Sequence, residues 1–315
     1  MKKPVSFTLV LMVVIGMFAG CHLDFPADSG NLKVIATIFP LYDWARTVAD
    51  NTDTEVELLL DNGVDMHSFQ PTAKDIIDIS DCDLFLYVGG ESDEWIEDVL
   101  EQAGNDDMIA LNLINILGNN AKQEELVEGM QAEDADADYD EHVWLSLKNA
   151  ALFTKEICTA LSQIDEANTA RYEANALEYI ALLNDLDAEY QETVDNASAR
   201  TLLFADRFPF RYLTDDYDLS YYAAFSGCSA ETEASFTTIL FLADKIDELK
   251  LKSILQTESS DGSIAKTVRE NTADKNQQIL TLDSLQNITR KRIDAGESYL
   301  SIMQNNLEIL KQALS

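Results

Sequence analysis

The chain has 315 residues, of which 46% are hydrophobic, and it carries 22 basic against 57 acidic side chains, a formal net charge of −35 at pH 7. This negative charge excludes nucleic acid as a partner, because phosphate binding requires the opposite sign. The acidity instead concentrates cations near the surface, and the length and apolar content suffice for two domains with real cores.

The first twenty residues have the layout of a cleavable export signal. Two lysines open the chain, residues 5–18 are apolar, and Cys21 follows directly after Ala-Gly. The apolar run is short for crossing a bilayer, and its order of regions is that of a secretory signal. The segment before Cys21 resembles the lipobox of bacterial lipoproteins. We predict a signal peptide over 1–20, a lipid on Cys21 and a polar tether over 21–30; a secretory signal with a chance cysteine is the alternative.

The rest of the chain alternates β-branched apolar runs with amphipathic stretches of helical length, which is typical of parallel sheets covered by helices. Predicted strands span 33–39, 55–60, 84–88 and 108–111, then 200–204, 220–225, 252–257 and 278–282. Predicted helices span 41–51, 72–80 and 93–102, with a last one over 298–314.

A different segment joins the halves. Residues 147–162 and 165–194 contain no proline or glycine, and the second stretch has apolar residues at helical spacing. Thirty helical residues would extend about 45 Å, long enough for one rigid spine; two shorter packed helices with a break near Asn184 are the alternative. We therefore expect an α/β protein with two Rossmann-like lobes, over 31–164 and 197–315, joined by a spine helix over 165–196.

Ligands of open α/β sheets bind beyond the carboxyl ends of the strands. Five side chains of metal-ligand type occupy such loops: His67, His142, Asp206, Glu258 and Asp283. Imidazole and carboxylate are ligands of zinc and related ions. Spacings of 64 to 77 residues from His67 through His142 and Asp206 to Asp283 exclude a compact zinc finger, so these side chains can meet only in a cleft between the lobes. Ordinary structural histidines are the alternative.

Four segments resemble the solute-binding lipoproteins of bacterial ABC importers specific for zinc and manganese. They are Val34-Ile-Ala-Thr-Ile-Phe-Pro-Leu-Tyr-Asp, Gly63-Val-Asp-Met-His-Ser-Phe-Gln-Pro-Thr, Asp140-Glu-His-Val-Trp-Leu-Ser and Thr281-Leu-Asp-Ser-Leu. The resemblance implies that His67, His142 and Asp283 bind the metal. It also implies a monomeric, non-enzymatic binding protein, lipid-anchored on the extracytoplasmic face of the cell membrane, that passes zinc to an ABC permease; manganese is the alternative cargo.

The third ligand position departs from the family. The segment Leu203-Phe-Ala-Asp-Arg-Phe-Pro-Phe places Ala205 where relatives carry histidine or glutamate. Asp206, Glu258 or a water could complete the shell, and the departure leaves zinc and manganese both open. Asp206 could also cap a helix or pair with a nearby arginine.

An acidic stretch and three cysteines can each be interpreted as structural or as functional. Residues 124–141 hold nine acidic side chains and no basic one; they could gather metal for His142 or form a solvated loop. Cys82, Cys158 and Cys228 allow at most one disulfide, and we predict them in the core.

Two other classes of protein remain possible. A metallohydrolase would also combine histidines, carboxylates and a cleft, although the sequence has no H-E-x-x-H or G-x-S-x-G motif. A surface adhesin would need an exposed apolar patch, which the dense acidity disfavours.

Overall fold

The computed structural model describes residues 31–61, 63–64, 66–105, 107–131, 139–229 and 233–315. The predicted signal peptide, the tether and Cys21 lie outside these residues. Within them, no helix has the length and apolar character needed to cross a membrane.

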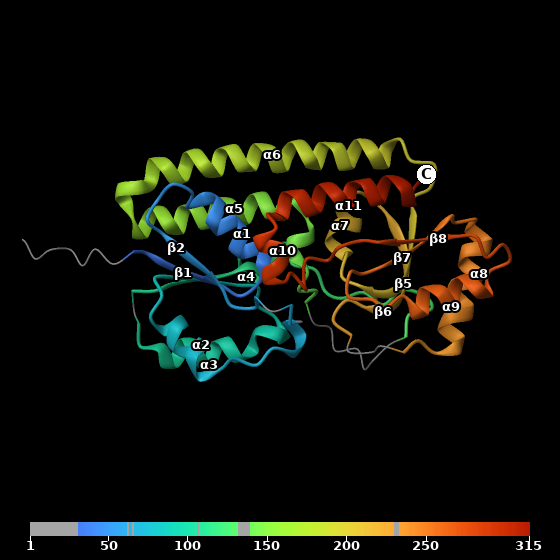
Figure 1. Cartoon of the computed structure of the whole chain (residues 1–315), viewed down its shortest axis with the longest axis horizontal. Helices are drawn as coiled ribbons and strands as arrows, with labels where there is room; N and C mark the ends of the chain where they lie inside the picture. The colour runs from blue at the N-terminus through green and yellow to red at the C-terminus, as the bar shows by residue number, and fades with distance from the viewer. Residues whose placement is uncertain (1–30, 62, 65, 106, 132–138, 230–232) are drawn as a thin grey trace, which may run out of the picture. The chain divides into compact units, whose positions relative to one another are not determined.

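The first lobe is built on a parallel sheet in the order β2-β1-β3-β4. Its strands are β1 (Lys33–Ala36), β2 (Glu55–Leu58), β3 (Leu84–Tyr87) and β4 (Ile109–Asn112). Alternate residues of a strand face opposite sides of a sheet. Val34 and Leu84 join the core beside α1 (Phe39–Val48) and α5 (Leu147–Ile164). Ile35 and Phe85 face the other side and pack toward α2 (Ala73–Ser80) and α3 (Glu94–Ala103). The sheet therefore lies between two helical layers, and the short helix α4 (Leu113–Leu117) follows β4 (Figure 1).

The second lobe repeats this plan in the order β6-β5-β7-β8. Its strands are β5 (Thr201–Phe208), β6 (Ser220–Ser226), β7 (Ser253–Gln256) and β8 (Gln278–Thr281), and all are parallel. One face is covered by α8 (Phe236–Leu249) and α9 (Ser263–Asn271), whose core includes Leu203 and Ala205. Helix α7 (Arg211–Asp216) follows β5, and α10 (Arg290–Asp294) and α11 (Tyr299–Ala313) follow β8. Both of the latter also reach the first lobe, because the Arg290 backbone N–H donates to the Asp61 carbonyl oxygen and α11 contacts α1.

Strand β5 is longer than the sequence predicts. Its pairing with β6 shifts in register between Phe204 and Arg207, and the strand then continues to Phe208. A bulge of this kind inserts residues without ending a strand. Asp206 therefore lies inside β5, and the interpretation of Asp206 as a helix cap is wrong, because α7 begins only at Arg211.

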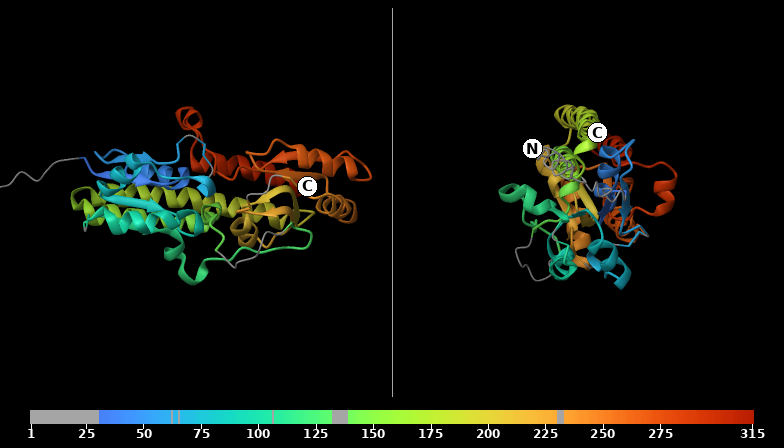
Figure 2. Two further views of the ribbon diagram at one scale, coloured as in Figure 1. Left: turned by 90° about the horizontal axis from the view of Figure 1, so that it is seen from below. Right: turned by 90° about the vertical axis from the view of Figure 1, so that its left-hand side faces the viewer.

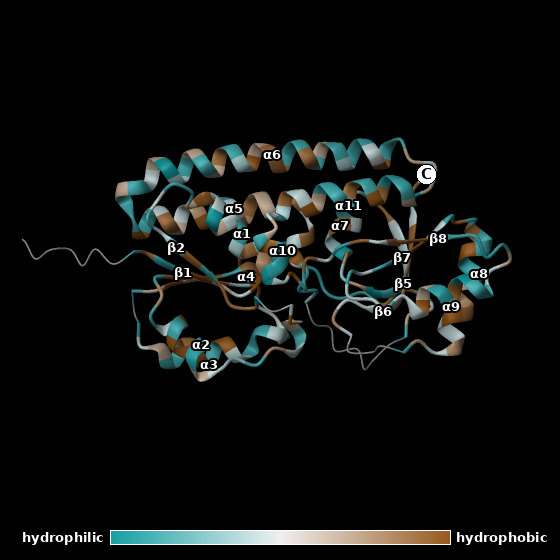
Figure 3. Cartoon of the chain, in the orientation of Figure 1, coloured by the Kyte–Doolittle hydropathy of each residue, from teal (hydrophilic) through white to brown (hydrophobic). Residues whose placement is uncertain are grey.

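The spine prediction is confirmed. Helix α6 (Thr169–Asp195) runs 27 residues through Asn184 without a break, so the alternative of two shorter helices is excluded. It starts later than residue 165 because residues 166–168 form a 3-10 turn. Its buried residues recur at helical spacing: Tyr172, Ala176, Tyr179, Leu183, Leu186, Tyr190 and Val194. Figure 3 shows this hydrophobic repeat along the helix.

One hydrophobic core extends through both lobes on the side of the spine. It contains Val34 and Leu86 of the first sheet, Leu202 and Leu255 of the second, and side chains of α5, α6 and α11. Helix α6 contacts α1, α5 and α11, and it is seen nearly end-on above the strands in the right-hand view of Figure 2. The lobes therefore share a core along the spine, and the polar loops at the carboxyl ends of their strands lie on another side.

Candidate metal site

His67 lies beyond the carboxyl end of β2 in a 3-10 turn (Met66–Ser68). Its Nδ1 is 2.7 Å from Ser92 Oγ and 3.5 Å from Glu141 Oε2. Glu141 Oε1 also accepts a hydrogen bond from the Ser92 backbone N–H at 2.8 Å. The His67 side chain is 15% exposed, so the ring is held by two neighbours while one edge reaches the solvent.

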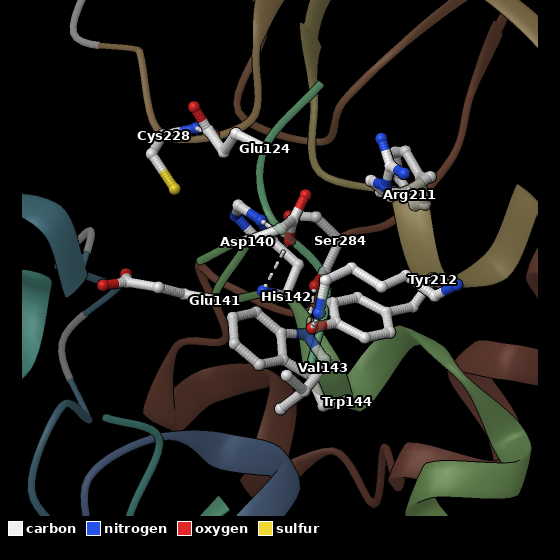
Figure 4. A network of polar contacts seen from close by, with 12 residues as sticks. Glu124, Asp140, Glu141, His142, Val143, Trp144, Arg211, Tyr212, Cys228 and Ser284 are labelled. Carbon is white, nitrogen blue, oxygen red and sulfur yellow. Dashed lines mark hydrogen bonds and ion pairs between the residues drawn. The ribbon is translucent and has the colours of Figure 1, made fainter. Parts of the chain in front are cut away.

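His142 immediately precedes a second 3-10 turn (Val143–Leu145) and is fully buried. Its Nδ1 is 3.0 Å from Asp140 Oδ1, which also accepts from the His142 backbone N–H at 2.9 Å. Figure 4 shows this contact, with Trp144 beside the imidazole; the two ring centroids are 5.3 Å apart. The rings of His142 and His67 lie 5.6 Å apart, so two loops that are 75 residues apart in the sequence bring both imidazoles together.

Acidic side chains lie near Nδ1 of both imidazoles. A carboxylate bonded to Nδ1 holds the proton there, orients the ring and directs the lone pair of Nε2 outward, as in carboxylate–histidine–metal arrangements. Asp140 has this position at His142. At His67 the Ser92 hydroxyl is the nearer partner of Nδ1, at 2.7 Å, and Glu141 Oε2 lies 3.5 Å away. Burial raises the pKa of Glu141 to about 7. Both acids belong to the acidic stretch 124–141, so this end of it is buried against the histidines and is not a solvated loop.

Cys228 joins the histidines from the second lobe. One ligand atom of each residue, two imidazole nitrogens and Sγ, lie within 4.8 Å of one another. The Cys228 backbone N–H donates to Glu124 Oε1 at 2.9 Å, and burial raises the pKa of the thiol. Cys82 and Cys158 are buried core residues as predicted, whereas Cys228 is only half-buried, and none of the three forms a disulfide.

Gln286 also faces the two histidines. Its side-chain Nε2 lies 2.5 Å from His142 Nε2 and 3.4 Å from His67 Nε2. An amide N–H can donate to the lone pair of a neutral imidazole. The Gln286 carboxamide therefore lies between the two Nε2 atoms, where an ion bound by both histidines would also lie.

Asp206 and Glu258 are bonded to neighbouring loops. Asp206 Oδ2 accepts from the backbone N–H and the hydroxyl of Thr257, at 2.8 and 2.7 Å. Glu258 accepts from the backbone N–H of Ser284 at 2.7 Å and from its hydroxyl at 2.8 Å. Burial and the nearby Asp283 raise the pKa of Glu258. Each carboxylate joins the ends of neighbouring strands.

Asp283 points toward helix α10. Its Oδ2 pairs with Arg292 Nη2 at 2.6 Å, and its Oδ1 accepts from the Leu285 backbone N–H at 2.9 Å. Among the described residues, the structure therefore groups His67 and His142 with Cys228, and it does not bring Asp206, Glu258 or Asp283 into that group. The three carboxylates stay predictions as ligands.

A cleft between the lobes leads to the histidines. It has a volume of about 1000 Å³ and is lined by residues of both lobes, including His67, Glu141, Asp206 and Cys228. The buried His142 is absent from this lining. An ion entering the cleft would reach His67 and Cys228 first and His142 last.

Sequence reasoning missed Cys228 and Gln286 as site residues. Cys228 lies two residues beyond the carboxyl end of β6, which is the position that singled out the other candidates, but its residue type suggested a core role. Gln286 comes three residues after Asp283, and nothing in its residue type indicates metal chemistry.

Known proteins match the chain along nearly its whole length. Residues 34–313 match the model of a family described as "Zinc-uptake complex component A periplasmic". The chain is 29% identical to the zinc-binding lipoprotein AdcA of Streptococcus pneumoniae over 319 residues, 98% of this chain and 61% of that protein. It is also 29% identical to the high-affinity zinc uptake system protein ZnuA of Bacillus subtilis over 293 residues, 91% and 90% of the two chains.

A solved structure supports the same relationship. The Zn(II)-bound ZnuA-like domain of Streptococcus pneumoniae AdcA matches with a TM-score of 0.73 at 27% identity, over 90% of this chain and 99% of that chain. The chain spans about three fifths of the length of AdcA. The resemblance found in the sequence motifs and the two-lobed α/β fold are thereby confirmed.

Proposed function

The chain belongs to the family of zinc-uptake complex component A, and we propose that it captures zinc outside the cytoplasm and delivers it to an ABC-type permease. The observation that carries this proposal is the convergence of His67 and His142, 5.6 Å apart, each with a carboxylate near Nδ1. Relatives named as zinc-binding or zinc-uptake proteins support zinc as the cargo.

The chemistry of the two histidines agrees with zinc better than with manganese. Imidazole nitrogen is a preferred zinc ligand, whereas manganese favours oxygen-rich shells of higher coordination number. Three of the carboxylates that could supply oxygen are already hydrogen-bonded or paired elsewhere. The protein binds its ion without turnover in this proposal, because a transport protein gains nothing from an activated water at the metal.

The proposal also includes the lipid anchor on Cys21. A relative is named a lipoprotein, and the segment before Cys21 has the required order of residues. Changing Cys21→Ser should release the protein from the membrane, because the acyl chains can no longer attach. Full membrane association of that variant would remove the anchor from the proposal.

Metal analysis of the purified protein tests the central function. Protein isolated without added metal should carry zinc, and chelator-treated protein should bind one zinc per chain in a calorimetric titration and manganese far more weakly. Binding should also raise the melting temperature, since a ligand specific for the folded state adds about 4 kcal/mol at a thousandfold excess over Kd. Absence of stoichiometric zinc binding would overturn the proposal.

A further inference from the structure

We infer, on the basis of the metal-capture function proposed above, that Cys228 is the third protein ligand, bound as a thiolate, and that the site selects thiophilic ions such as zinc and cadmium against manganese. The three donor atoms come from separate loops, His67 after β2, His142 before α5 and Cys228 after β6, and all lie within 4.8 Å of one another. A sulfur donor from the second lobe thus faces two nitrogen donors from the first.

The distances fit metal binding with a small contraction. Zinc–nitrogen bonds of about 2.0–2.1 Å and zinc–sulfur bonds of about 2.3 Å place the donors of a tetrahedral ion roughly 3.3–3.8 Å apart. The observed group, with separations up to 4.8 Å, needs to close by about 1 Å. The Gln286 amide, which lies 2.5 Å from His142 Nε2 and 3.4 Å from His67 Nε2, would move aside as the ion enters and the donors close around it.

The loop that carries Cys228 is built for close approach to His142. A Cβ atom at Gly227 would lie 2.8 Å from His142 Cε1 and 2.9 Å from the Phe208 carbonyl oxygen, so only glycine fits there without displacing the imidazole. The hydrogen bond from the Cys228 backbone N–H to Glu124 holds the next residue. The loop therefore sets the thiol beside the histidine at a fixed position.

The thiol is also reachable from the cleft. Cys228 and His67 both line it, whereas Cys82 and Cys158 are buried in the cores. When the ion arrives, it displaces the thiol proton, which leaves to solvent, and a metal–sulfur bond forms without any change of oxidation state. Coordination by thiolate requires this loss of the proton.

A thiolate decides which ions the site accepts. Soft sulfur ligands favour zinc and related ions, whereas manganese prefers carboxylate, carbonyl and water oxygen. Among the described residues, no carboxylate of the second lobe joins the group: Asp206, Glu258 and Asp283 are bonded to other residues. The neutral carboxamide of Gln286 also contacts both histidines. Within the part of the chain that the structure describes, the donor set therefore contains two nitrogens, one sulfur and at most the weak amide oxygen of Gln286.

Cadmium binding reports directly on the sulfur. Titration of the full chain with Cd²⁺ should give an ultraviolet sulfur-to-metal charge-transfer band that saturates at one ion per chain. The band should be lost in Cys228→Ala and kept in Cys158→Ala, the matched cysteine control. The zinc affinity of Cys228→Ala should fall at least tenfold, and Cys228→Asp should lower the ratio of zinc to manganese affinity at least tenfold.

The outcomes separate this inference from the proposed function. Wild-type zinc affinity and a retained band in Cys228→Ala would overturn the thiolate ligand while leaving zinc capture standing, whereas no zinc binding by the wild-type protein would overturn zinc capture itself. Alkylation of the unsubstituted protein gives a test that does not depend on the folding of a variant. Zinc should protect Cys228 from iodoacetamide, as read by mass spectrometry, and equal labelling with and without zinc would refute the inference.

Discussion

The two lobes have the same sheet order and contribute to the site in different ways. The first lobe supplies two imidazoles, and each has its own carboxylate near Nδ1, Asp140 for His142 and Glu141 for His67. In the second lobe the predicted ligands Asp206, within β5, and Glu258 and Asp283, just after β7 and β8, are each bonded within that lobe. It turns Cys228 and Gln286 toward the histidines instead.

The acidic side chains of the first lobe lie beside the imidazoles, whereas those of the second lobe link neighbouring loops. Asp206 accepts two hydrogen bonds from the buried Thr257, so moving it toward a metal would leave buried donors unsatisfied, at about 1–3 kcal/mol for each group. Asp283 would give up its ion pair with Arg292 and the hydrogen bond from the Leu285 backbone N–H. The imidazoles of the first lobe meet no such cost, because Asp140 lies at Nδ1 of His142 and Ser92 at Nδ1 of His67, which leaves each Nε2 for the ion.

Removing an imidazole should have the largest effect on zinc affinity, because it removes one of the two nitrogen ligands that the first lobe supplies. We expect His67→Ala and His142→Ala each to weaken zinc binding at least a hundredfold, about 2.7 kcal/mol, in a calorimetric titration. His142→Ala should also lower the melting temperature of the metal-free protein more than His67→Ala does, since His142 is fully buried and His67 is 15% exposed. Wild-type affinity in either variant would contradict the assignment of that histidine.

A negative charge introduced at residue 286 of the second lobe should have an intermediate effect on zinc affinity. Gln286→Glu places a carboxylate beside both Nε2 atoms, and a carboxylate is a stronger zinc ligand than a carboxamide. We expect zinc affinity to rise about tenfold, or about 1.4 kcal/mol. Gln286→Ala is the control, because it removes the amide without adding charge and should not tighten binding. Unchanged affinity in Gln286→Glu would show that residue 286 stays outside the metal shell.

The smallest effect is expected at Asp206, one of the groups that the sequence analysis offers to complete the shell in place of Ala205. Asp206→Asn keeps the shape of the side chain and weakens the acceptor for two hydrogen bonds from Thr257. Zinc affinity should stay within about twofold of wild type, while the free energy of unfolding falls by about 0.5–1.5 kcal/mol for each weakened bond. A tenfold loss of affinity with an unchanged melting temperature would restore Asp206 as a ligand.

Much of the fold was predictable from local pattern. All eight strands appear within a few residues of their predicted positions, because β-branched runs between helical stretches specify a parallel sheet. The end of β5 was not predictable, since the polar pair Asp206-Arg207 indicates a loop, and only pairing with β6 through a register shift extends the strand to Phe208.

The site was predictable where residue type and strand position coincide. His67 follows from both, and His142 follows from its residue type in the loop ahead of the predicted spine; the structure brings their rings together. The direction of Asp283 depends on Arg292, which α10 places beside it, and Cys228 could be read as a core residue or as a ligand until its neighbours in space were known. The direction of a carboxylate and the role of a cysteine depend on tertiary contacts, which a local sequence pattern does not predict.

The shared core along the spine limits how the protein can be divided. Helix α11, at the end of the chain, packs on α1 and α6, and the Tyr299 hydroxyl donates to the Trp144 carbonyl oxygen at 2.7 Å. A fragment ending after α6 would leave the apolar sides of α1 and α6 exposed to solvent. The remaining fragment would lose α6, on which α11 packs. Neither half is therefore an autonomous folding unit, and splitting the gene at the lobe boundary should produce two insoluble polypeptides that regain structure only by reassociating.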